Sequence, residues 1–256
     1  MRTTRLVAAL MALALLAAAC GSEASGEYAL VTEGTLTVCT DSPYPPMEFE
    51  DPETGEYTGF DIEMMRAIAG ELGLELSVVN SGFDPITSGL AMETDQCDIA
   101  AASITITPER EENIDFSDGY FSGDQSLLAA EEMSFVGLAD LAGKNIGVQT
   151  GTTGEIYANA NNPGATVISY ENPGDLITAL LAGEVDAALQ DIVVNGDAAL
   201  SNPDLTIVET YPTDEFYGFA VKEEGKEALL EAVNGALATL RDNGTYDRIF
   251  ADWFGS

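Results

Sequence analysis

The sequence predicts an α/β protein made of two Rossmann-like lobes joined by a hinge. Strand and helix patterns alternate along residues 36–102, and the same order recurs along residues 144–191. Such alternation favours a parallel sheet with helices on both faces. Extended segments at 125–129 and 217–221 are expected to cross between the lobes. The expected lobe boundaries are residues 34–124 plus 220–256 for the first lobe and residues 125–219 for the second.

The first repeat begins with a strand and alternates regularly. Apolar residues recur at helical spacing from Ile62 to Leu72, and Gly73 is a typical helix stop. Asp84 and Pro85 are typical of a helix start. The expected elements are strand 36–40, helix 59–72, strand 74–79, helix 84–92 and strand 99–102.

The second repeat has the same order of elements, and two helices follow it. Gly183 is expected to end the second helix of this repeat, and Asn243-Gly244 to end an amphipathic helix near the carboxyl terminus. The expected elements are strand 144–149, helix 151–159, strand 166–170, helix 173–182, strand 186–190, helix 227–242 and a last helix whose apolar face packs in the core.

The motif Ser-Ile-Thr-Ile-Thr-Pro-Glu-Arg, which ends at Arg110, follows the third expected strand. Thr107 has the chemistry of a helix N-cap and Pro108 that of a first helical residue. Arg110 would then lie in a first helical turn, where the helix dipole disfavours a cation. A guanidinium can hold a carboxylate through two parallel hydrogen bonds, so Arg110 is a candidate anion site. The alternative is a surface arginine beside a helix cap.

Composition excludes several classes of function. The chain has 9 Lys and Arg residues against 44 Asp and Glu residues, and it has no histidine. This acidic excess disfavours nonspecific binding to nucleic acid, so we expect no nucleic-acid partner. The absence of histidine excludes Ser-His-Asp and Cys-His catalysis and histidine metal sites, while carboxylate chemistry remains possible. We expect no cofactor, no bound metal and a monomeric protein.

The amino-terminal residues are predicted to direct export. Residues 1–19 have a basic start and an apolar stretch that is too short to span a bilayer. Cys20 follows directly, which resembles a bacterial lipoprotein signal. We therefore expect a lipid on Cys20 and a tether at residues 20–33 that holds the protein at the cell membrane. The alternative is cleavage by ordinary signal peptidase, because the stretch ends in Ala-x-Ala.

Two further cysteines, Cys39 and Cys97, are predicted to be buried free thiols. Cys39 lies near the end of one expected strand and Cys97 just before the start of another. If these strands are parallel neighbours, extended geometry separates the two residues by about 13 Å. A disulfide requires Cα atoms within about 7 Å.

The predicted sheets also place a ligand site. In open α/β sheets, ligands bind beyond the carboxyl ends of the strands. Those ends combine a cation, carboxylates, hydroxyls and aromatic rings with a helix start, where backbone amides favour an anion. This mixture suits a small zwitterion. The candidate ligand-binding residues are Asp41, Tyr44, Phe83, Ser103, Thr105, Arg110, Gln149, Thr152, Thr153 and Asp191.

Several motifs in a fixed order resemble one family. They are Thr-Asp-x-x-Tyr-Pro-Pro at 40–46, Gly-Phe-Asp-Ile at 59–62, the motif at 103–110, Phe-Ser-Asp at 116–118, Gly-Val-x-x-Gly-Thr-Thr at 147–153, Asp-Ala-Ala-Leu-x-Asp at 186–191 and Gly-Thr-Tyr-Asp at 244–247. Together they resemble the polar-amino-acid solute-binding proteins, the substrate receptors of bacterial ABC importers. The similarity covers residues 34–255. It implies the two-lobed type II periplasmic-binding fold and a permease partner.

The resemblance also implies roles for individual residues. Arg110 is implied to bind the α-carboxylate of the ligand, with Thr105 and the helix start at Thr153. Asp191 is implied to bind the α-ammonium, with Ser103 and Thr105; its alternative is a helix N-cap.

The ligand side chain is expected to be neutral and polar or cationic. Tyr44 and Phe83 match aromatic residues that pack on the ligand side chain, although loop packing is the alternative for both. Asp41, Gln149 and the negative field of the chain favour a neutral polar or cationic side chain over an acidic one. The alternative for Asp41 is that it only braces its loop. An acidic ligand would need a second cation, and none except Arg110 is expected to reach the site.

Two other classes of function compete with an amino-acid receptor. One is a cyclohexadienyl dehydratase on the same fold, which would need a carboxylic acid beside the leaving hydroxyl. Glu48 and Asp41 are the nearby candidates. The other is a sensor input module, which would normally be joined to a membrane-spanning signalling region.

Overall fold

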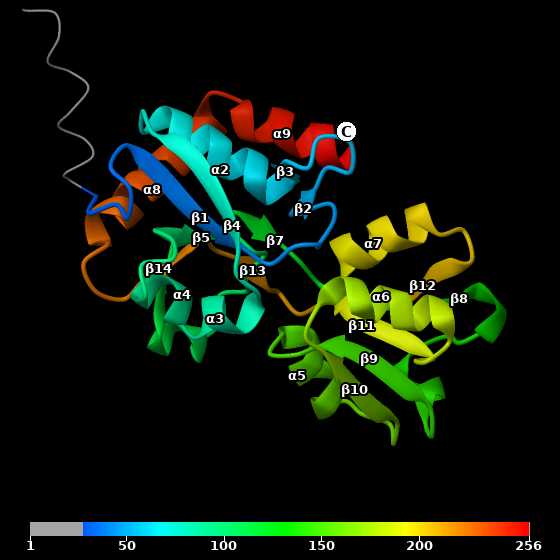
Figure 1. Cartoon of the computed structure of the whole chain (residues 1–256). Coiled ribbons are helices and arrows are strands. Elements are labelled where there is room, and N and C mark those ends of the chain that lie inside the picture. Colours follow the sequence, from blue (N-terminus) through cyan, green and yellow to red (C-terminus); the bar gives the residue numbers. More distant parts are fainter. Residues whose placement is uncertain (1–27, 256) are drawn as a thin grey trace, which may run out of the picture.

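A computed structural model describes residues 28–255 (Figure 1). The predicted signal peptide, Cys20 and most of the predicted tether lie outside the described residues. Within the described part, no helix has the length and apolarity to cross a membrane.

The described chain contains two five-stranded sheets, each at the centre of one lobe. The sheet of lobe 1 has the order β4 (Glu75–Asn80), β1 (Thr35–Thr40), β5 (Ile99–Ala100), β14 (Ala220–Lys222) and β6 (Ile114–Phe116). The sheet of lobe 2 has the order β10 (Thr166–Tyr170), β9 (Asn145–Gln149), β11 (Ala187–Asp191), β8 (Gln125–Ala130) and β12 (Leu205–Tyr211). The predicted two-lobed α/β fold is therefore confirmed.

Each sheet has a parallel core that is extended by antiparallel strands. β1 pairs in parallel with β4 and β5, and β9 with β10 and β11. β14 is antiparallel to β5 and β6, and β8 is antiparallel to β11 and β12. The sequence predicted the parallel strands of both sheets. It did not predict that β6, β8, β12 and β14 extend these sheets as antiparallel strands.

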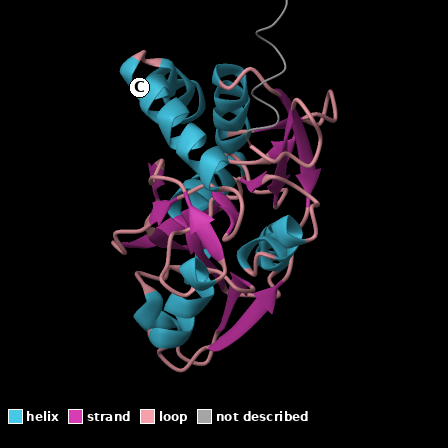
Figure 2. Cartoon of the chain, turned by 90° about the vertical axis from the view of Figure 1, so that its left-hand side faces the viewer, coloured by secondary structure: helices cyan, strands magenta, loops and turns pink. Residues whose placement is uncertain are grey.

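Helices cover both faces of each sheet (Figure 2). In lobe 1, successive residues of β1 point to opposite faces of the sheet. Val38 packs on the face covered by α2 (Phe60–Glu71), α8 (Glu227–Asp242) and α9 (Thr245–Phe254). Cys39 packs on the other face, which is covered by α3 (Phe83–Thr87) and α4 (Leu90–Glu93). In lobe 2, Leu127 of β8 faces α5 (Thr153–Ala160), and Leu128 faces α6 (Pro173–Ala182) and α7 (Ile192–Ser201). The remaining elements are β2 (Phe49–Glu50), β3 (Tyr57–Thr58), β7 (Phe121–Ser122), β13 (Phe216–Tyr217) and the 3-10 turns η1 (Arg110–Glu112), η2 (Glu131–Met133) and η3 (Leu138–Leu141).

The lobes are joined by β7 and β13, which pair antiparallel between the two large sheets (Figure 1). The predicted crossing at 125–129 is wrong, because β8 pairs along its length inside the sheet of lobe 2. The second predicted crossing, at 217–221, is correct only at its first residue, Tyr217. Ala220 and Val221 already belong to the sheet of lobe 1. Both crossings lie a few residues earlier in the chain than expected. An extended segment that crosses between lobes has the same sequence pattern as a strand inside a sheet, so the pattern alone does not separate the two.

Cys39 and Cys97 form a disulfide with their Cα atoms 5.6 Å apart. The prediction of two free thiols is therefore wrong. It assumed extended geometry from Cys97 into the third strand, but β5 contains only two residues, and bends at Gln96 and Asp98 flank Cys97. The extended spacing does not apply to such a turn. The disulfide lies in the buried cluster between the sheet and α3–α4.

Two predicted helices are shorter than expected. The helix expected at 84–92 is split into α3 and α4 at Gly89, which has a left-handed backbone (φ +79°). The helix expected after Thr107 is only the turn η1, although the Thr107 hydroxyl accepts a hydrogen bond from the Arg110 amide (3.3 Å), as an N-cap would. A single turn is enough to fix the start of the Arg110 side chain.

Candidate ligand-binding site

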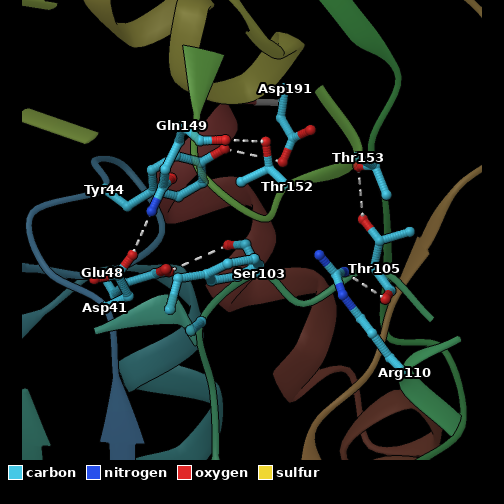
Figure 3. A pocket seen from close by; sticks show the side chains of 12 residues that line it. Asp41, Tyr44, Glu48, Ser103, Thr105, Arg110, Gln149, Thr152, Thr153 and Asp191 are labelled. Atoms are coloured by element: carbon cyan, nitrogen blue, oxygen red, sulfur yellow. Dashed lines mark hydrogen bonds between the residues drawn. The ribbon is translucent and has the colours of Figure 1, made fainter. Parts of the chain in front are cut away.

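All ten residues predicted to bind the ligand lie around one pocket between the lobes (Figure 3). Glu48 and Ala102 complete its lining. In this structure the free space at its centre is only about 20 Å³, which is room for about one water molecule. Arg110 and Asp191 approach it from opposite sides.

The carboxyl ends of the strands place these residues, as the fold class predicts. Asp41 follows β1, Ser103 follows β5, and Gln149 and Asp191 are the last residues of β9 and β11. Thr152 caps α5 by accepting a hydrogen bond from the Glu155 amide at 3.2 Å. The site therefore depends on both parallel cores.

Direct hydrogen bonds connect the two lobes across the pocket. Gln149 Nε2 donates to Asp41 Oδ2 at 2.7 Å, and the Tyr44 hydroxyl donates to Asp191 Oδ2 at 3.0 Å. Arg110 Nη2 donates to the carbonyl of Gly151 at 3.1 Å. The lobes are thus closed over the pocket in this structure.

Arg110 is a buried cation held by neutral groups. Its Nη1 donates to the Thr105 carbonyl at 2.8 Å, and its guanidinium lies 5.0 Å from the centre of the Phe83 ring. Among the described residues, no carboxylate forms an ion pair with Arg110. Burial lowers the pKa of Arg110, although the charges of Asp191 and Glu215 oppose this shift. A buried guanidinium without an acidic partner favours an anion in the pocket.

Asp191 is a buried carboxylate surrounded by hydrogen-bond donors. It accepts hydrogen bonds from the hydroxyls of Tyr217 (2.7 Å) and Tyr44 (3.0 Å) and from Gln125 Nε2 (2.5 Å). Burial raises its pKa, and the hydrogen bonds oppose the rise. Although Asp191 stands at the N-cap position of α7, its side chain makes no capping hydrogen bond, so the helix-cap alternative is wrong.

Glu215 is a residue of this region that the sequence analysis missed. Its Oε2 accepts hydrogen bonds from the hydroxyls of Thr153 (2.8 Å) and Thr105 (3.2 Å) and from Gln125 Nε2 (3.2 Å). The Thr105 hydroxyl, which was expected to help bind the ligand carboxylate, and the Thr153 hydroxyl therefore donate to a protein carboxylate from opposite lobes. The only sequence signal was the position of Glu215, two residues before the expected crossing at Tyr217.

Glu48 and Asp61 form a second group, which the sequence analysis did not assign to ligand binding. The Ser103 hydroxyl donates to Glu48 Oε2 at 3.2 Å, and the Ser103 amide donates to Asp61 Oδ2 at 2.9 Å. The Tyr120 hydroxyl also donates to Asp61 at 2.7 Å. Both acids lie inside motifs quoted for the family resemblance or next to them, and this was the available signal.

Comparison with known proteins places the chain in a family. It matches the bacterial extracellular solute-binding proteins, family 3, over residues 36–256. The lysine/arginine/ornithine-binding periplasmic protein of Escherichia coli strain K12 is 32% identical over 244 residues, which are 91% of this chain and 92% of that protein.

Solved structures give the same result. An ancestral arginine-binding protein bound to arginine has a TM-score of 0.81 and 37% identity, with 87% of this chain and 99% of that chain covered. An ancestral amino acid-binding protein, described as a precursor of cyclohexadienyl dehydratase, has a TM-score of 0.77 and 35% identity, with 86% and 95% covered. These similarities span both lobes and the pocket, and the chain therefore belongs to the bacterial extracellular solute-binding proteins of family 3.

Proposed function

We propose that this protein binds a free amino acid with a cationic side chain, of the arginine type, and delivers it to an ABC importer. The observation that carries the proposal is the charge of the pocket lining. Three carboxyl groups, those of Asp41, Glu48 and Asp191, face one cation, Arg110. A zwitterion with an additional positive charge matches this set.

The charges can be assigned one by one. Arg110 binds the α-carboxylate, and Asp191 binds the α-ammonium. Asp41 and Glu48 then remain for the side chain, and both favour a cation. Tyr44 and Phe83 supply flat apolar surface for its stem, and a guanidinium stacks well on an aromatic ring.

An acidic ligand would lack a partner for its side chain. Arg110 is the only basic residue among the described residues that line the pocket. Lys144, Lys222 and Lys226 pair with carboxylates elsewhere, at 3.2, 3.6 and 2.8 Å. A neutral polar ligand such as glutamine ranks second, because Gln149 and Asp41 offer hydrogen bonds to an amide.

The arginine-binding relatives support this ligand class. The Escherichia coli relative is named for lysine, arginine and ornithine, and one similar structure contains arginine. We propose binding rather than dehydratase activity for this chain. Incubation with prephenate and arogenate tests that choice: turnover that disappears in Glu48→Gln would contradict it.

We also propose that the mature protein is a monomer that a lipid on Cys20 anchors outside the cytoplasm, where the permease can receive its ligand. Membrane fractionation tests the anchor. Cys20→Ala should release the protein into the soluble fraction, and unchanged membrane attachment would contradict lipidation at this residue.

Calorimetric titration with three ligands tests the proposed recognition. Arginine carries both α-groups, agmatine lacks the α-carboxylate, and 5-guanidinopentanoic acid lacks the α-amino group. Each analogue leaves one buried charge of the pocket without a partner, so we expect both to bind at least about 30-fold more weakly than arginine. Equal affinity of arginine and agmatine would contradict the role of Arg110.

A further inference from the structure

Glu48 is a buried acid whose position is fixed by its own loop. Its exposed fraction is 1%, and it lines the pocket beside Ser103. The backbone of Glu48 pairs with that of Tyr44 through hydrogen bonds of 2.7 and 3.1 Å. The carboxyl group therefore points at the pocket and lies away from bulk water.

Ser103 joins Glu48 to a second buried acid, Asp61, whose exposed fraction is 0%. The Ser103 hydroxyl donates to Glu48, and its amide donates to Asp61. Ser103 adopts a left-handed backbone (φ +49°), which is unfavourable for a residue with a side chain. This conformation aims both donors of one residue at the two carboxyl groups.

The groups that face this pair from other elements are acidic or neutral. Asp41 follows β1 and accepts a hydrogen bond from Gln149, and Asp191 lies across the pocket with Tyr44. Tyr120 donates to Asp61 from behind. The single cation of the described lining, Arg110, donates to two backbone carbonyls instead.

Two neighbouring buried carboxyl groups without a cation are costly to ionise together. Burial, followed by the charges of Asp61 and Asp41, raises the pKa of Glu48 well above its usual value. Burial raises the pKa of Asp61 to about 7. Both pKa shifts agree with at least one proton on the Glu48–Asp61 pair at neutral pH when no ligand is bound.

We propose that Glu48 holds a proton in the empty pocket and releases it to solvent when a cationic ligand side chain binds, which makes Glu48 a determinant of specificity. The proton leaves the carboxyl group, and the ligand cation takes its place as the partner of the carboxylate. The guanidinium keeps its own protons, so one proton enters solvent for each ligand bound. This inference rests on the proposed function.

The exchange separates cationic ligands from neutral ones of the same shape. Citrulline has a neutral urea group where arginine has its guanidinium, so citrulline leaves the proton on Glu48. Below the pKa of Glu48, arginine affinity should rise up to about tenfold per pH unit relative to citrulline affinity. Proton changes at Arg110 or Asp191 are shared by both ligands and cancel in the comparison.

Calorimetry in buffers of different ionisation enthalpy counts the released protons. At pH 7, we expect wild-type protein to release close to one proton more with arginine than with citrulline. In Glu48→Gln this difference should disappear, and arginine should lose at least about tenfold in affinity. Asp41→Asn is the comparison variant: it removes the other pocket carboxylate assigned to the ligand side chain and should also weaken arginine binding, but Glu48 keeps its own proton to release.

Equal proton release with arginine and citrulline in the wild-type protein would overturn the inference, and that comparison requires no variant to fold. Retained release in a folded Glu48→Gln protein would also overturn it. Tight arginine binding without proton release would leave the proposed function standing. Absence of arginine binding would contradict both.

Discussion

Replacement of Arg110 by alanine should abolish useful affinity for the ligand. In the structure this guanidinium is buried, rests against the Phe83 ring and donates to the carbonyls of Thr105 and Gly151. Its remaining N–H groups can bind the α-carboxylate, since a guanidinium has five donors. The variant leaves that carboxylate buried near Asp191 without a cation.

The size of the effect follows from the loss of one partner of a desolvated charge pair. Such a loss costs about 2–5 kcal/mol, which corresponds to roughly 30-fold to several-thousand-fold in affinity. The free protein also loses two hydrogen bonds from Arg110, each with a net value of about 0.5–3 kcal/mol. The variant should still fold, because the gap opens toward the pocket and water can enter.

Calorimetry with arginine measures the loss, and thermal unfolding without ligand verifies the fold. Agmatine is the matched ligand control, because it has no carboxylate for Arg110 to bind and should lose little affinity in the variant. Arg110→Lys keeps the charge without the planar fork and should fall between wild type and Arg110→Ala. Arginine affinity within threefold of wild type in a folded Arg110→Ala protein would contradict the role of Arg110 in binding the α-carboxylate.

Four other changes have defined outcomes. Asp191→Asn should lower the affinity for arginine by about 30-fold or more. The affinity for 5-guanidinopentanoic acid, which has no α-amino group, should fall much less, and calorimetric titration measures both. Glu215→Gln should open the ligand-free lobes, and an unchanged radius of gyration in small-angle scattering would contradict this. Joint replacement of Cys39 and Cys97 by serine removes a link of sequence separation 58 and should lower the free energy of unfolding by about 4 kcal/mol in urea titrations. Burial raises the pKa of Asp61 to about 7, so the native state binds more protons than the unfolded chain between about pH 4 and 7. The free energy of unfolding therefore falls as pH rises through this range. Asp61→Asn should make the free energy of unfolding depend less on pH.

The pocket lining could be predicted well because parallel strands bring their carboxyl ends to one edge. Asp41, Ser103 and Asp191 each follow or end a strand whose apolar pattern is visible locally. Once both sheets are predicted, the carboxyl ends of their strands give the place of the site, and no contact between distant residues has to be known. Hydrophobic periodicity likewise identifies α2 and α8, since it depends only on neighbouring residues.

The missed features depend on contacts between distant segments. β14 contains only three residues, and its place between β5 and β6 is fixed by pairing across more than a hundred residues. Glu215 enters the site because β13 pairs with β7. The Cys39–Cys97 disulfide depends on a turn whose shape the sequence pattern does not specify.

Glu48 is a residue that the sequence brings to attention without indicating its role. From the sequence, Glu48 was named as an acid near the site, but only as a candidate for dehydration. Its partner Asp61 lies on α2, and only the folded chain shows that Ser103 joins the two. The ranking of a cationic ligand above a neutral one depends on Glu48 and Asp41 together in the pocket lining.

A thermal-shift screen of the twenty amino acids measures whether the pocket selects a cationic amino acid. Ligand binding to the native state raises the unfolding temperature, and at equal concentration a ligand that binds more tightly raises it further. We expect the largest shift with arginine or lysine at pH 7, a smaller shift with glutamine, and none of these shifts in Arg110→Ala. A largest shift with glutamate or aspartate would contradict the proposed ligand class, because an acidic side chain would need a second cation and Arg110 is the one basic residue among the described residues of the lining.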